Sequence, residues 1–129
     1  MQYLLLIYQQ EGSATSAASD EEMASERAGY GAFTVETRER GQLVAGEALE
    51  PTTTATSVRL REGQVFVTDG PFAETKEALG GFYLLECRDL DEAIEMAAKI
   101  PAVKRGTIEV RPIWTLPAEY SMTGGGDAS

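Results

Sequence analysis

The chain has 129 residues, 43% of them apolar and 25% charged, which is the composition expected of one globular domain with a single core. Its 21 acidic and 11 basic residues give a net charge of −10 without any basic stripe, which argues against direct nucleic-acid binding. There is no histidine and one cysteine, Cys87, so an internal disulfide, histidine-dependent catalysis and a clustered zinc site are excluded. Any acid or base chemistry must come from carboxylates, lysine, tyrosine or Cys87, and no metal or cofactor is expected.

The first third of the sequence predicts a strand, a helix and a second strand. Residues 3–8 form a continuous apolar run, typical of a central strand that is buried on both faces. Ser19 and Glu22 have the spacing of a capping box, and a helix is expected from about residue 20 to residue 40, with Gly41 as its stop. Residues 43–49 predict a short strand. No apolar run approaches the roughly 20 residues of a membrane helix, and no basic segment suggests a signal peptide, so we expect a cytoplasmic protein.

A β-hairpin is predicted around the dipeptide Glu62-Gly63. Pairing residue 60 with residue 65 places four apolar side chains on one face, namely Val58, Leu60, Val65 and Val67. Asp69-Gly70-Pro71 ends the second strand, because proline cannot donate to a ladder and restricts the residue before it.

The last third predicts a strand, a helix and a strand. Residues 82–87 again carry apolar side chains on both faces. Asp89 and Glu92 form a capping pair for a helix that ends before Pro101, with an apolar stripe through Leu90, Ala93, Ile94, Ala97 and Ala98. Residues 107–114 predict a final strand, and Pro112 within it favours an edge position.

This order of elements predicts an α+β fold, a ferredoxin-like βαββαβ core with an extra β-hairpin. Two helices can cover only one face of the sheet, whereas residues 3–8 and 82–87 carry large apolar side chains on both faces. Because an apolar face of that size is rarely left in water, we expect a homodimer. Residues 1–118 are expected to form the domain, and residues 119–129, which include three successive glycines, a disordered C-terminal tail.

One segment resembles the signature of a known family. Residues 67–77, VTDGPFAETKE, followed by LGGFY at residues 79–83, resemble the DGPF branch of the YCII-related proteins. Further similarity lies in residues 3–8, 91–95, 100–101 and 109–113. The resemblance implies a dimeric α+β barrel of ferredoxin-like halves, in mostly bacterial proteins of unassigned function that are often encoded beside extracytoplasmic-function sigma factors.

Asp69 is the candidate catalytic residue. More distant YCII-like proteins look like enzymes built on a histidine-aspartate pair, related in fold to muconolactone isomerase; the aspartate carries over to Asp69, while the histidine has no counterpart in this chain. At the end of a strand, a rigid turn could aim this carboxylate into a cleft beside the sheet. Alternatively, the carboxylate accepts backbone hydrogen bonds within its own Asp-Gly-Pro turn.

Three loop residues are candidates for ligand binding. Phe72 could form the wall of a pocket, or it could close over the core. Glu74 and Lys76 could flank the mouth of such a pocket, or they could belong to a solvated surface.

Two strand residues, Arg59 and Arg111, complete the candidate site. Together with Glu86 and Glu109 they could bind a small anion, or they could form ion pairs across strands. The sequence thus favours a small-molecule-binding protein or weak enzyme, with a pocket between the sheet and the Asp-Gly-Pro-Phe loop and a small acidic or aromatic ligand. The alternative is an accessory regulator that binds an extracytoplasmic-function sigma factor through its acidic surface.

Overall fold

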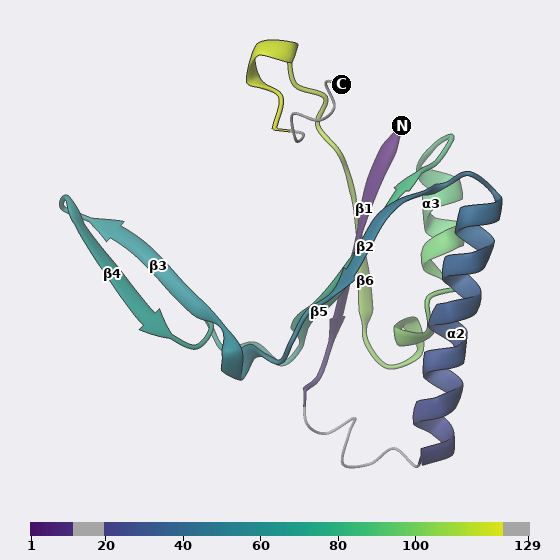
Figure 1. The fold of residues 1–129 in the computed structure, drawn as a ribbon, viewed down its shortest axis with the longest axis horizontal. Helices are drawn as coiled ribbons and strands as arrows, with labels where there is room; N and C mark the ends of the chain where they lie inside the picture. Colours follow the sequence, from purple (N-terminus) through teal and green to yellow (C-terminus); the bar gives the residue numbers. More distant parts are fainter. Residues whose placement is uncertain (12–19, 123–129) are drawn as a thin grey trace.

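The computed structural model describes residues 1–11 and 20–122, in which four antiparallel strands form the main sheet (Figure 1). The strand order is β2-β5-β1-β6, which confirms the predicted ferredoxin-like core, with β1 and β5 central and β6 at an edge. The elements are β1 (Gln2–Gln9), α2 (Asp20–Glu39), β2 (Leu43–Ala48), η1 (Thr52–Thr54), β3 (Thr56–Arg61), β4 (Gln64–Asp69), β5 (Ala78–Glu86), α3 (Leu90–Ala97), η2 (Pro101–Lys104), β6 (Thr107–Pro112) and η3 (Ala118–Tyr120). Ser19 and most of the predicted tail lie outside the described residues.

The core lies between the sheet and its two helices, which pack on the same side (Figure 1). Leu5 of β1 and Leu85 of β5 are fully buried there, together with Met96 and Ile100. Because side chains alternate along a strand, the neighbouring residues of β1 and β5 point to the other side of the sheet. No helix of the described residues is long and apolar enough to span a membrane.

The helix α2 begins with three acidic residues, which suit the positive end of its dipole, and stops where the sequence predicts. Gly41 has a φ of 72°, and Gln42 donates its N–H to the Thr37 carbonyl at 2.8 Å. Gly29 lies against η2, since a Cβ there would come within 2.8 Å of Pro101. A glycine in mid-helix therefore permits a close contact.

The helix α3 is capped as predicted, but it buries a different stripe. Glu92 donates its N–H to the Asp89 carboxylate at 2.9 Å. The buried residues are Ala93, Met96 and Ala97, whereas Leu90 and Ile94 are about half exposed, so the predicted stripe is wrong in part.

The face of the sheet opposite the helices has an apolar centre, which we call the open sheet face: Leu4, Leu6, Phe82 and Leu84. Leu4 lies opposite Leu84 and Leu6 opposite Phe82, so the four side chains form one cluster on two central strands. Because both helices lie on the other side, no helix of the described residues covers this face (Figure 1).

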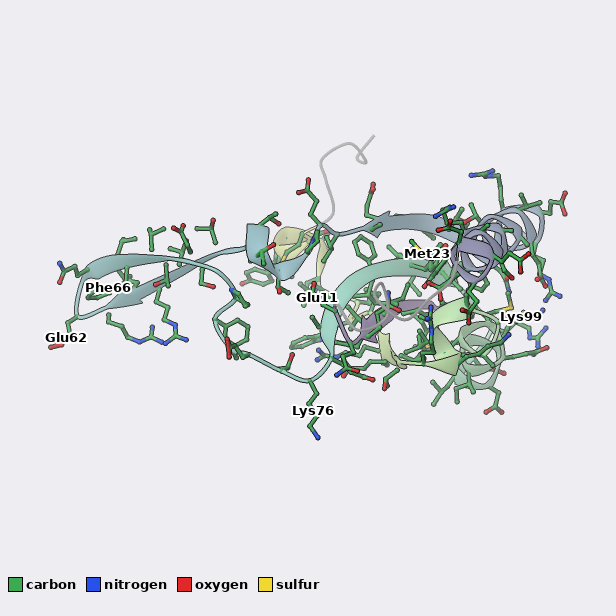
Figure 2. The ribbon with its side chains drawn as sticks, turned by 90° about the horizontal axis from the view of Figure 1, so that it is seen from below. Glu11, Met23, Glu62, Phe66, Lys76 and Lys99 are labelled. Carbon is green, nitrogen blue, oxygen red and sulfur yellow. The ribbon has the colours of Figure 1, made fainter. Side chains whose placement is uncertain are left out.

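The strands β3 and β4 form a separate two-stranded hairpin, residues 56–69, which we call the hairpin arm. It projects from the sheet on the side away from the helices (Figures 1 and 2). Leu60 pairs with Val65 and Val58 with Val67, as predicted. The turn uses positive φ values of 51° at Glu62 and 76° at Gly63, the backbone that a two-residue hairpin requires.

Candidate functional site

The Asp-Gly-Pro-Phe loop is fixed to the base of the hairpin arm. Asp69 is the last residue of β4 and lies opposite Thr56. The next residue, Gly70, has a φ of 97°, donates its N–H to the Ala55 carbonyl at 2.7 Å and accepts the Ser57 hydroxyl at 2.8 Å. Since a positive φ strains residues that carry a Cβ, glycine is required here, and the turn holds Asp69 in a defined place.

A hollow of about 750 Å³, which we call the loop hollow, separates this loop from η1 and from the start of β5. Three of the predicted site residues line it together: Asp69, Glu74 and Lys76. Glu11, Thr52 and Ala78 line it as well. The structure thus places a hollow beside the end of the sheet, where the sequence predicts one.

Glu11 and Thr52 are lining residues that the sequence analysis missed. The Glu11 carboxylate accepts the backbone N–H of Thr52 at 2.9 Å and also its hydroxyl. These hydrogen bonds hold the pKa of Glu11 below its ordinary value, so the carboxylate stays ionised. The two residues are 41 positions apart, and neither belongs to a motif that would have marked it.

The Asp69 carboxylate is exposed at the wall of the loop hollow. Within the described residues it accepts no hydrogen bond, so it does not cap its own turn. The charged residues that line the hollow are three carboxylates and one amine, which gives it a net charge of −2: Glu11, Asp69, Glu74 and Lys76. This charge favours ligands that donate hydrogen bonds and disfavours anions.

Phe72 and Arg59 lie in a second, smaller hollow on the polar face of the hairpin arm. It measures about 460 Å³ and is also lined by Arg61 and Phe66. Phe72 is 76% exposed, so the expectation that it closes over the core is wrong. Pro71 contacts both hollows, because the loop runs between them. Phe72 and Asp69 thus line different hollows, although only two residues lie between them in sequence.

Arg111 belongs to neither hollow. It lies on β6 opposite Leu4, and Glu109 lies opposite Leu6, so both flank the open sheet face. Arg59 is in the other sheet and shares no face with them.

Cys87 is buried, and its burial raises the pKa of the thiol, which disfavours the nucleophilic thiolate. In the part of the chain that the structure describes, no group of three or more acidic or cysteine side chains is placed to hold a metal ion.

Comparison with known proteins identifies a family and shows a similar fold among solved structures. The model of the YCII-related domain matches residues 1–117. An uncharacterised protein of Rhizobium meliloti is 43% identical over 115 residues, which cover 88% of this chain and 92% of that protein. The 5-chloro-2-hydroxyhydroquinone dehydrochlorinase of Burkholderia phenoliruptrix, in complex with 2,5-dihydroxybenzoquinone, has a similar fold, with a TM-score of 0.53. It is 14% identical, and the alignment covers 94% of this chain and all of that one.

Proposed function

The chain belongs to the YCII-related family, and we propose that it is a cytoplasmic homodimer that binds a small hydroxylated aromatic molecule in the loop hollow, either as a binding protein or as a weak enzyme. One observation carries this proposal. The loop hollow gathers Asp69, Glu74 and Lys76, and within the described residues the Asp69 carboxylate has no hydrogen-bond partner of its own.

The net negative charge of the loop hollow favours ligands with hydroxyl groups. Ring hydroxyls donate hydrogen bonds to carboxylates, and such charge-assisted bonds are about twice as strong as neutral ones. Asp69 would accept a hydroxyl proton in a hydrogen bond or, in a weak enzyme, remove it as a base. The dehydrochlorinase of similar fold is in complex with 2,5-dihydroxybenzoquinone, a six-membered ring with two hydroxyl groups, which supports the choice of a hydroxylated ring as ligand.

The alternative function is an accessory regulator that binds an extracytoplasmic-function sigma factor. It is favoured by the net charge of −10, which suits a basic protein surface, and by the family resemblance. This alternative predicts an association that weakens steeply with salt and does not depend on Asp69.

The ligand proposal is tested by calorimetric titration of catechol and hydroquinone, with benzoate as an anion without hydroxyl groups. We expect at least one hydroxylated ring to bind, and Asp69→Ala to weaken it about tenfold or more, the effect of one lost hydrogen bond to a charged group. Glu95→Gln, which neutralises an exposed carboxylate on α3, should bind as wild type does. Equal binding by all three proteins, or binding of benzoate alone, would exclude the proposed site.

Thermal unfolding separates this role from a turn-capping role. Since the Asp69 carboxylate accepts no hydrogen bond from the described residues, Asp69→Ala should change the free energy of unfolding by less than about 0.5 kcal/mol. A residue that caps its own turn would lose roughly 0.5 to 2 kcal/mol. A loss in that range, with Asp69→Asn neutral, would assign Asp69 to the turn.

A further inference from the structure

The hairpin arm exposes more apolar surface than a free hairpin can keep in water. Its apolar face, which consists of Val58, Leu60, Val65 and Val67, is 61–65% exposed at every position. In the described residues, β3 and β4 pair only with each other. Because an isolated two-stranded hairpin is at best marginally stable, these side chains need a surface to pack against.

We propose that the hairpin arm docks through its apolar face on a second copy of this chain. The proposal rests on the homodimer proposed above and adds a contact that the main sheet does not supply.

The direction of the arm favours a second copy. Both views show it leaving the sheet on the side away from the helices, which is the side of the open sheet face (Figures 1 and 2). A copy that packs against the open sheet face therefore lies alongside the arm. In a two-fold dimer each arm reaches the other chain in the same way, so one continuous interface covers both apolar surfaces.

The charge of the arm favours the same occupant. The arm, residues 56–69, contains Arg59, Arg61, Glu62 and Asp69 as its charged residues, a net charge of 0, so the whole −10 of the chain lies outside the arm. Neither arginine pairs with a carboxylate within the described residues. An arm of zero net charge meets less repulsion from a second acidic body than the rest of the −10 chain does, and its two arginines can pair with carboxylates of that body.

Two double variants on β4 test the proposal. Val65→Lys with Val67→Lys charges the apolar face, whereas Gln64→Lys with Thr68→Lys adds the same charge to the opposite face. All four positions are exposed, so we expect the main sheet and the helices to stay folded in both variants, which circular dichroism verifies. By sedimentation equilibrium, the dimer dissociation constant should rise about tenfold or more in the apolar-face variant and less than about threefold in the control.

Hydrogen exchange supplies the second measurement. Amides in residues 56–69 should be protected in the wild-type dimer and exchange freely in the apolar-face variant. An unchanged dissociation constant with rapid arm exchange would overturn the docking and leave the homodimer intact. If the arm amides are protected but the apolar-face variant dimerises as tightly as wild type, the arm packs on another partner or on its own chain. The proposed docking on a second copy is then wrong. A monomeric wild type would overturn the homodimer, and the arm contact with it.

Discussion

Tyr30 shows how burial at a single residue sets a pH dependence. Burial between α2 and the sheet, with Glu26 and Tyr83 nearby, raises the pKa of Tyr30 to about 12, against a weaker opposing hydrogen bond from the Ala102 backbone. An unfolded chain ionises this phenol near its ordinary value of about 10. The folded state therefore retains a proton that the unfolded state loses between about pH 10 and pH 12.

The prediction is that Tyr30 contributes to stability fully below pH 10 and that this contribution falls as pH rises toward 12. Urea unfolding of wild type and Tyr30→Phe at pH 8, 10 and 11 should show a constant difference in free energy up to pH 10. Above pH 10 the wild type should lose stability relative to the variant. The exposed Tyr120 supplies the control, Tyr120→Phe. A difference between wild type and Tyr30→Phe that does not change with pH would contradict the assignment.

Among the residues of the candidate site, the sequence could predict those that lie close together along the chain. Asp69, Glu74 and Lys76 lie within one loop, so a local signature is enough to bring them to one hollow. Phe72 belongs to the same signature, but it lines the hollow on the hairpin arm, while the residues on either side of it line the loop hollow. The Glu11 carboxylate meets Thr52 through tertiary packing alone, which no local pattern records.

At the scale of elements, the sequence predicts a structure correctly where its apolar pattern fits one arrangement only. Where the pattern fits two arrangements, tertiary packing decides between them. The hairpin register follows from strict alternation about Glu62-Gly63, and the structure confirms it. The short helix α3 offers two adjacent apolar stripes, and packing selects the one through Met96. The strand β5 begins earlier than predicted, since Gly81 fits tightly against the backbone of β2, where a Cβ would come within 2.8 Å of the Glu47 carbonyl oxygen.

The cap of α3 gives the prediction at this scale. Asp89→Ala leaves the Glu92 N–H without its acceptor and should lower the free energy of unfolding by roughly 0.5 to 2 kcal/mol. Asp89→Asn keeps an acceptor oxygen and should stay within a few tenths of a kcal/mol of wild type. Urea unfolding of the three proteins at pH 7 measures both changes. Equal losses in the two variants would show that charge, rather than the hydrogen bond, accounts for the contribution of Asp89.

At the scale of the whole molecule, the sequence indicates that both faces of β1 and β5 are apolar, and the structure shows helices on one face. The sequence could not place the hairpin arm, because its direction depends on the connections at residues 49–55 and 70–77 rather than on its strands. The partly buried apolar centre of the open sheet face and the exposed hairpin arm both lie on the side without helices (Figure 1). Because the two surfaces lie on the same side, a single dimer interface can cover the open sheet face and the hairpin arm together.

Leu84 tests that interface directly. It lies at the centre of the open sheet face, half-buried and opposite Leu4, so a lysine there places an unpaired charge where the second sheet must pack. Such a charge costs several kcal/mol, and Leu84→Lys should raise the dimer dissociation constant about 100-fold or more. Ile94→Lys makes the same kind of change on α3, where the side chain is 51% exposed, and should leave the dimer intact.

Light scattering across micromolar concentrations measures the association of wild type, Leu84→Lys and Ile94→Lys, and circular dichroism verifies that each is folded. We expect dimers for wild type and Ile94→Lys and a folded monomer for Leu84→Lys. If Leu84→Lys dimerises as tightly as wild type, the chains associate through another surface. If the wild type is monomeric and fully soluble, the apolar centre of the sheet is stable in water and needs no second chain.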